Sequence, residues 1–203
     1  MKIYGSSGST CTRRALMAIA EKGVTCEFIP VDLSKGEQKQ PAYMQMQPFG
    51  VIPVLEDDDG FKLYESRAIM RYLDVRLPGT ALTPSTVQER GLMEQWISVE
   101  QSNFSSPALR IIKQLLWSQQ PPDNAIVADA QKEVQRVLVV LEPLLKSQTY
   151  LAGDTFSLAD ITYMPYLGYL LQAKGIDLSA YPAVQAWWQR ISERPSWIKV
   201  SQG

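Results

Sequence analysis

Strand-like patterns in this chain are confined to the first third, and only helical periodicity follows them. The strand candidates are Lys2–Gly5, Cys26–Asp32, Val54–Leu55 and Phe61–Tyr64. Helical periodicity occupies residues 12–22 and 66–77. Pro78–Pro84 then has the composition of a linker, and no strand pattern follows it. The sequence predicts an α+β fold with a βαβββα N-terminal domain over residues 1–77, a linker over 78–85 and an all-helical domain over 86–203.

Turn residues and prolines refine this arrangement. Asp57-Asp58-Asp59-Gly60 has the turn chemistry of an antiparallel hairpin, and Gly23 is suited to end the first helix. Pro30 cannot donate to a strand ladder, so its strand is expected at an edge of the sheet. The faces expected to be buried on the next two long helices are Leu92, Trp96 and Val99, and then Val127, Val134, Leu138, Leu141 and Leu145.

Composition indicates an ordinary globular protein and argues against several partners. Twenty Lys and Arg residues against 21 Asp and Glu give a net charge of -1, without the basic excess that a nucleic-acid binder needs. No apolar segment approaches the length needed to cross a bilayer, so we expect no membrane insertion and a cytoplasmic location. Cys11 and Cys26 form no CxxC motif, which argues against a disulfide scaffold or a dithiol redox centre.

Histidine is absent from the chain, and this restricts the available chemistry. Catalysis by an imidazole base and metal sites with histidine ligands are excluded. A reaction at this protein must use hydroxyls, carboxylates, Lys, Arg, Tyr, Cys or backbone amides.

The loop Gly5-Ser6-Ser7-Gly8-Ser9-Thr10-Cys11 joins the first strand to the first helix, where backbone N–H groups are unsatisfied and the helix dipole is positive. A hydroxyl here can donate to an anion. Ser9, Thr10 or Thr12 can equally serve as a helix cap, which is the commoner role for such residues. Cys11 is open to two interpretations, as a reactive thiol in this field or as a small buried side chain.

Gln47–Leu55 places an Ile52-Pro53 bond just before a predicted strand. Proline is tolerated there because its missing N–H need not join the ladder. A cis bond would turn the N–H and C=O of Ile52 toward a ligand, which could then bind like an added strand. A trans turn proline is the alternative.

Glu65 and Ser66 stand at a predicted strand-to-helix junction. They can cap the helix, and they can also bind a ligand: the first-turn amides and Ser66 a carboxylate, and Glu65 an ammonium group. Ser157 and Asp160 form a capping-box pattern flanked by Phe156 and Ile161, which we interpret as structural.

Five motifs in this order resemble the cytosolic glutathione transferases, in particular the phi class. They are Ser9-Thr10-Cys11-Thr12-Arg13-Arg14, Gly36-Glu37-Gln38-Lys39, Pro48-Phe49-Gly50-Val51-Ile52-Pro53, Glu65-Ser66-Arg67-Ala68-Ile69 and Ser157-Leu158-Ala159-Asp160. The resemblance covers the whole chain. It implies a thioredoxin-like N-terminal domain, a cis bond before Pro53, and glutathione as co-substrate without a metal or other cofactor.

The same resemblance assigns roles to individual residues. Ser9 would be the catalytic serine, and Ile52, next to Pro53, would bond the cysteinyl backbone of glutathione. Lys39 would pair with the glycyl carboxylate beside Gln38, and Glu65 with Ser66 would bind the γ-glutamyl end. Gln38 stands where the class usually carries histidine, so that contact can donate a hydrogen bond but has no charge.

The reaction implied is attack of the glutathione thiolate on a small apolar electrophile, with peroxide reduction as a further activity. The apolar wall is expected from the helical domain, with Ile112, Leu115, Leu116 and Trp117 as candidates. Core packing is the commoner role for such a stripe.

A homodimer is also implied, with Phe49 as a large apolar residue in a polar loop that either inserts into the partner or packs on its own domain. Two other functions stay open: a non-catalytic carrier or scaffold of the same fold, and a glutathione-dependent thiol reductase that uses Cys11. A pure scaffold has no reason to keep Ser9, Lys39, Glu65 and Ser66 together.

Overall fold

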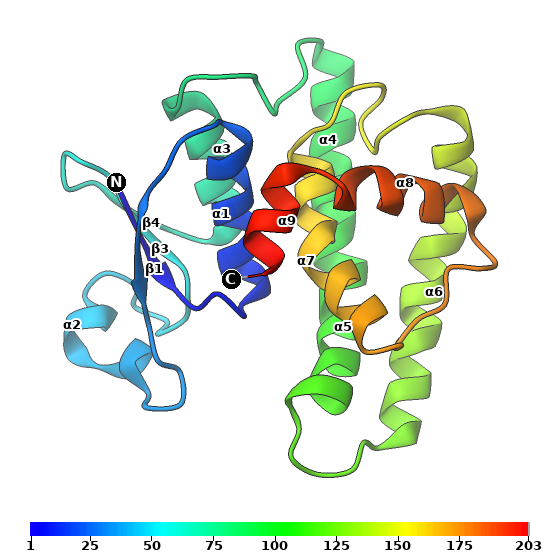
Figure 1. Ribbon diagram of the computed structural model, residues 1–203, viewed down its shortest axis with the longest axis horizontal. Helices are drawn as coiled ribbons and strands as arrows, with labels where there is room; N and C mark the ends of the chain where they lie inside the picture. Colours follow the sequence, from blue (N-terminus) through cyan, green and yellow to red (C-terminus); the bar gives the residue numbers. More distant parts are fainter. Residues whose placement is uncertain (203) are drawn as a thin grey trace. The chain divides into compact units, whose positions relative to one another are not determined.

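The computed structural model describes residues 1–202 and divides into two compact units (Figure 1). The first unit comprises Met1–Leu82 and the C-terminal residues from Pro195 onward. The second unit comprises Thr83–Arg194. The expected assignment of all residues from 86 to the helical domain therefore differs from the structure at the C-terminal end of the chain.

The first unit contains a four-stranded mixed sheet with strand order β2-β1-β3-β4. Its strands are β1 (Lys2–Gly5), β2 (Glu27–Pro30), β3 (Val54–Glu56) and β4 (Lys62–Tyr64). β1 runs parallel to β2 and antiparallel to β3, and β3 pairs antiparallel with β4. β2 lies at an edge of the sheet, as Pro30 predicted.

Helices α1 (Thr10–Glu21) and α3 (Ser66–Arg76) pack against each other beside this sheet (Figure 1). Apolar residues of α1 and α3, among them Met17 and Ile69, are fully buried. Between β2 and β3 the chain forms the 3-10 turn η1 (Glu37–Lys39) and the one-turn helix α2 (Pro41–Met44). The observed order is therefore βαβαββα, with one more short helix than the pattern of strands and long helices predicted.

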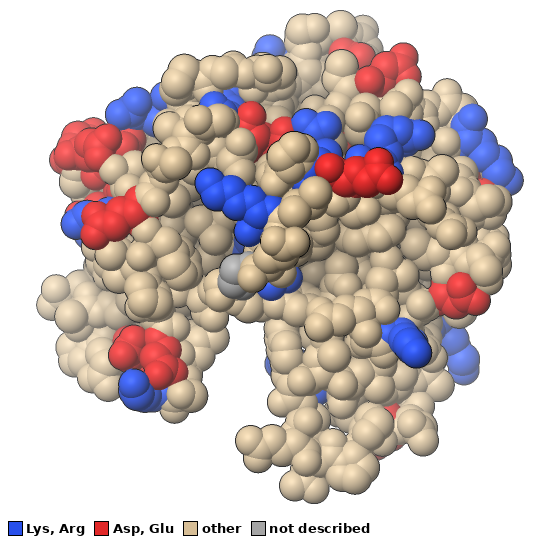
Figure 2. All heavy atoms as spheres, in the orientation of Figure 1, with Lys and Arg blue, Asp and Glu red and all other residues tan. Residues whose placement is uncertain are grey.

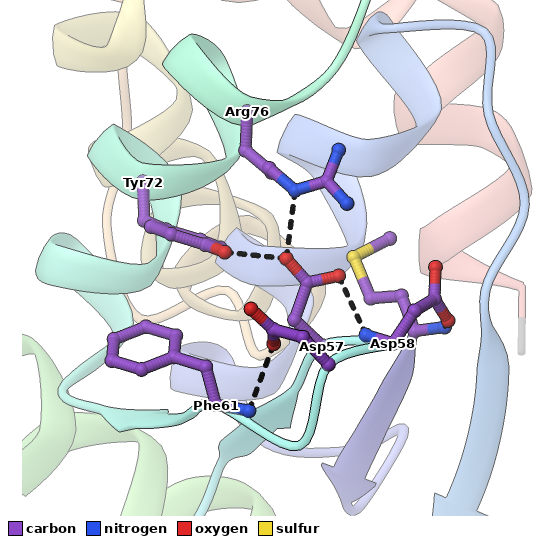
Figure 3. A network of polar contacts seen from close by, with 7 residues as sticks. Asp57, Asp58, Phe61, Tyr72 and Arg76 are labelled. Atoms are coloured by element: carbon purple, nitrogen blue, oxygen red, sulfur yellow. Dashed lines mark hydrogen bonds and ion pairs between the residues drawn. The ribbon is translucent and has the colours of Figure 1, made fainter.

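Asp57 ties the β3–β4 turn to helix α3 (Figure 3). Its carboxylate accepts hydrogen bonds from the Tyr72 hydroxyl, from Arg76 Nε at 2.9 Å and from the Asp58 N–H at 2.8 Å. The Phe61 ring packs on the Tyr72 ring with centroids 5.3 Å apart. The hairpin turn is confirmed, but Asp57 does more than form a turn: it fixes α3 against the sheet.

The last helix, α9 (Pro195–Ser201), packs on α1 within the first unit. Trp197 and Val200 are buried there. The Ser196 hydroxyl donates to the Glu21 carboxylate, and Arg13 Nη2 donates to the carbonyl of Ser201 at 3.3 Å. A short amphipathic helix needs a partner for its apolar face, and sequence periodicity does not say which partner that will be.

Helices joined by loops make up the second unit, residues 83–194, and they follow here in chain order. They are α4 (Val87–Val99), the π-helical segment η2 (Glu100–Phe104), α5 (Ser105–Ile112), the π-helical segment η3 (Lys113–Trp117), α6 (Asn124–Ser147), α7 (Leu158–Gln172) and α8 (Pro182–Ser192). The predicted buried stripe of α6 from Val127 to Leu145 is confirmed. On α4 the prediction was partly wrong: Trp96 is buried, but Met93 and Ile97 are its buried neighbours, whereas Leu92 is 37% exposed.

Asp160 organises the core of the second unit. Ser157 and Asp160 form the predicted capping box at the start of α7. The fully buried Asp160 carboxylate also accepts from the Leu151 N–H at 3.1 Å and from Trp187 Nε1 at 2.9 Å. One carboxylate thus joins the preceding turn and α8 to the start of α7.

Among residues 1–202, none of the helices has the length and apolar character required to span a membrane. On the face drawn in Figure 2, acidic and basic side chains are interspersed, which agrees with the near-zero net charge.

Candidate active site

The register of the sheet brings the predicted site loops of the first unit together at one edge, which is formed by the ends of the strands and not by an outer strand. Gly5, the last residue of β1, pairs with Pro30, the last residue of β2. Val54, the first residue of β3, pairs with Tyr4 on one side and with Tyr64, the last residue of β4, on the other. The loops that follow β1, β2 and β4 and the loop that precedes β3 therefore meet at the same edge. These four loops carry every glutathione-binding residue that the resemblance implied.

Ser9 is the N-cap of helix α1 in this cluster. Its Oγ accepts a hydrogen bond from the Thr12 N–H at 3.3 Å, and its extended backbone is normal for a cap. Capping uses the hydroxyl oxygen as an acceptor and leaves the hydroxyl proton available to donate. The structural role of Ser9 and a role as donor to a ligand are therefore compatible.

The surroundings of Ser9 favour an anion. The first turn of α1 contains no acidic residue, so no carboxylate competes for the positive end of the helix dipole. Arg13 Nε donates to the carbonyl of Ser7 at 2.8 Å, which holds the serine loop against α1. Cys11 is half-buried and its Sγ lies 3.9 Å from Arg14 Nη1.

Lys39 and Gln47 hold the loop before β3 from two sides. Lys39 Nζ donates to the carbonyl of Phe49 at 3.0 Å, and the Phe49 N–H donates to Gln47 Oε1 at 2.7 Å. A Cβ at Gly50, where φ is +59°, would lie 2.8 Å from Lys39 Nζ and 2.9 Å from the Gln38 carbonyl oxygen. This close approach requires glycine. Gln38 Oε1 is buried and makes no hydrogen bond to a described residue.

The Ile52-Pro53 bond is cis, as the resemblance implied. Neither the N–H nor the C=O of Ile52 bonds to a described residue. The Ile52 side chain packs against the buried cluster of Val31, Tyr43 and Val54. The Tyr43 hydroxyl donates to the Val51 carbonyl at 3.0 Å, and burial raises the pKa of Tyr43 to about 12. Tyr43 therefore fixes the loop as a neutral donor while the backbone of Ile52 remains unpaired.

Glu65 and Ser66 begin α3 with an unusual backbone conformation. Glu65 has φ of 71°, a region that non-glycine residues seldom occupy, and it lies exposed just before the helix. Ser66 is buried, and neither its N–H nor its hydroxyl bonds to a described residue. Backbone strain of this kind is concentrated at binding sites, where other interactions over-determine it.

The four candidates for the apolar wall have different environments within the second unit. Ile112 is fully buried in the core and so does not fit the prediction of a ligand contact. Leu115 is partly buried, and its Cδ1 would lie 3.3 Å from a Cβ at Gly175. Leu116 is partly buried, and Trp117 is 46% exposed with its ring edge-on to Tyr169. Leu115, Leu116 and Trp117 are therefore the accessible members of the set.

Sequence reasoning missed three residues that position the site: Arg13, Tyr43 and Gln47. Arg13 was noted only as part of a motif. Tyr43 is a lone aromatic in a polar segment, which is a weak signal of a local core. Gln47 is fully buried, and a glutamine in a polar loop gives no indication of this.

Comparisons with known proteins agree with this geometry. The family model described as the glutathione S-transferase N-terminal domain matches residues 1–75, and the model of the C-terminal domain matches residues 104–195. Glutathione S-transferase F9 from Arabidopsis thaliana is 40% identical, with 97% of this chain and 94% of the relative covered. The crystal structure of glutathione transferase F7 from Populus trichocarpa superposes with a TM-score of 0.93 at 38% identity, covering 99% of this chain and 97% of that one.

The chain belongs to the glutathione S-transferase family. Its first unit has the thioredoxin-like fold of the family, and its matched plant relatives are of the F type, the phi class. A further solved structure, glutathione S-transferase I from maize in complex with an atrazine glutathione conjugate, has a TM-score of 0.90 at 33% identity. It covers 99% of this chain and 96% of that one.

Proposed function

We propose that this transferase binds glutathione at the sheet edge described above and that Ser9 stabilises the thiolate for attack on a small apolar electrophile. The observation that carries the proposal is the hydrogen bonding of the Ser9 hydroxyl. Its oxygen accepts from the Thr12 N–H, so its proton is free to donate at the positive end of α1.

The required stabilisation is within reach of such a donor. A free thiol has a pKa of about 8.5, and lowering it by about two units takes roughly 2.7 kcal/mol of preferential stabilisation of the anion. A hydrogen bond to a charged acceptor contributes about 1.5–3 kcal/mol, and the helix dipole adds up to about 1 kcal/mol. Ser9 would remain neutral and form no covalent bond to the substrate.

The rest of glutathione would bind along the same edge. Glu65 would pair with the γ-glutamyl ammonium, while Ser66 donates to the γ-glutamyl carboxylate. The unpaired backbone of Ile52, before Pro53, would bond the cysteinyl residue as an added strand. Lys39, exposed and bonded only to a carbonyl, would move to the glycyl carboxylate beside the amide nitrogen of Gln38.

The electrophile would be apolar, with Leu115, Leu116 and Trp117 as contacts from the second unit. Their partial exposure supports this role, in contrast to the buried Ile112. The maize relative was crystallised with an atrazine glutathione conjugate, which makes aromatic halides a reasonable class of test substrate. Detoxification of such compounds in the cytoplasm is the physiological role we propose.

We further propose a homodimer anchored by Phe49. Phe49 is 67% exposed, and its ring meets the Tyr64 ring in a T-shaped arrangement at a centroid distance of 6.2 Å, so most of the residue is available to a partner. Val51, two residues on, is 47% exposed. Exposed apolar residues grouped in one loop are typical of an interface.

Retention on immobilised glutathione followed by conjugation of a chromogenic aryl halide tests the proposal. We expect elution by free glutathione and turnover without added metal. Glu65→Gln should raise KM for glutathione, whereas Glu193→Gln, which removes an exposed carboxylate from the end of α8, should not. Retention without turnover against a panel of electrophiles would favour the carrier function, and turnover that depends on Cys11 would favour the thiol reductase.

A further inference from the structure

A pocket of about 440 Å³ lies within the first unit, lined by α1, β2 and α9 and the residues next to them. None of the proposed glutathione contacts lines it. Its apolar lining comes from Leu16 and Ile19 of α1, Val24, Phe28 of β2 and Val200 of α9. Its volume is in the range of small-molecule sites.

The polar groups of this pocket are hydrogen-bond donors and one thiol. They belong to Ser7, Thr25, Lys199 and Cys26, and no Asp or Glu lines the pocket. The hydroxyls of Ser7 and Thr25 donate to no described residue, and Lys199 forms no ion pair within residues 1–202. A pocket with an apolar body and unpaired donors, one of them cationic, is complementary to an anion with an apolar tail.

The thiol of Cys26 does not neutralise this positive charge. Burial raises the pKa of Cys26, so the group remains a neutral thiol at physiological pH, although Lys199 and the chain N-terminus act in the opposite direction. The ammonium group of Lys199 is therefore available to a bound anion.

We propose that this pocket binds a small carboxylic acid with an aliphatic tail, at a site separate from that of glutathione. The tail would contact Leu16, Ile19 and Phe28, and the carboxylate would accept from Lys199 and the hydroxyl of Ser7 or Thr25. Any effect on catalysis would pass through Ser7, which is two residues before Ser9 and whose carbonyl is held by Arg13.

Protection of Cys26 from alkylation measures occupancy. In a Cys11→Ser background Cys26 is the one remaining thiol, so its reaction with iodoacetamide at alkaline pH can be followed by intact mass. Octanoate is the probe, and octan-1-ol is the uncharged control of the same chain length. We expect octanoate to slow the alkylation of Cys26 at least fivefold at saturation, with or without saturating glutathione, and octan-1-ol to act much more weakly.

Matched charge variants test the role of the cation. Lys199→Gln should weaken octanoate binding, measured by calorimetry, about three- to tenfold, because the pair is partly exposed to solvent. Lys132→Gln removes an exposed lysine from α6 and should leave the affinity unchanged. Equal protection by the alcohol, absence of protection, an unchanged affinity in Lys199→Gln, or displacement of octanoate by glutathione would each overturn the proposal.

Discussion

Replacement of Ser9 by alanine separates its two roles, because the structure gives each one a different magnitude. As the N-cap of α1 it accepts from the Thr12 N–H, and loss of such a cap costs about 1 kcal/mol of stability. As a donor to the thiolate it would contribute about 1.5–3 kcal/mol, which corresponds to a rise of about one to two units in the pKa of bound glutathione. We therefore expect Ser9→Ala to lower kcat/KM at least tenfold at neutral pH while the protein stays folded.

The assay is the ultraviolet absorption of the bound thiolate followed against pH, together with the pH–rate profile of conjugation. Both midpoints should move to higher pH in Ser9→Ala, and activity should partly recover as pH rises. Thr86→Ala is the matched control, because Thr86 caps α4 by accepting from the Glu89 N–H at 3.2 Å. It should lose comparable stability with an unchanged thiolate titration. Unchanged midpoints in Ser9→Ala would refute the proposed role of Ser9.

Four other variants probe the remaining site and the fold. Cys11→Ser should leave conjugation nearly unchanged; loss of most activity with retained glutathione binding would favour the reductase function. Phe49→Ser should sediment as a monomer at micromolar concentration, and a variant that stays dimeric and binds glutathione normally would contradict the proposed anchor. Asp160→Ala leaves several buried donors unpaired and should lower the free energy of unfolding in urea by about 3–5 kcal/mol, with a loss under about 1 kcal/mol as the contrary result. Hydrogen bonding from Tyr72, foremost, lowers the pKa of Asp57. The stability that the Asp57 carboxylate contributes is therefore present above its unfolded pKa of about 3.9 and is lost as pH falls through its folded pKa. Tyr72→Phe should shift acid unfolding to higher pH, and an unshifted transition would contradict this.

Local patterns in the sequence determined the elements and several of their ends. The hairpin turn at Asp57–Gly60, the edge position of β2, the buried stripe of α6 and the capping box of Ser157 and Asp160 all follow from hydrogen bonds or periodicity within a few residues. Such signals are readable because both partners lie in one short segment.

The site itself was predicted from motifs, and its assembly required the sheet. Ser9, Ile52 and Glu65 are distant in sequence, and only the register of β1, β3 and β4 brings their loops to one edge. The same holds for the supports that the sequence did not reveal, such as Gln47, whose burial depends on residues folded around it.

Tertiary packing alone decided where the last helix lies and which face of α4 is buried. The pattern of α9 shows an apolar face but not that α1 covers it, and on α4 the apolar residues fit two overlapping stripes, of which packing selected Met93, Trp96 and Ile97. Asp160 makes one interaction that the local sequence determines and one that only tertiary packing determines. The sequence determined its bond to the Ser157 N–H three residues away, whereas its bond to Trp187 exists because α7 and α8 pack together. A pattern specifies what each segment needs to bury or to bond, and only the folded chain determines which distant group meets that need.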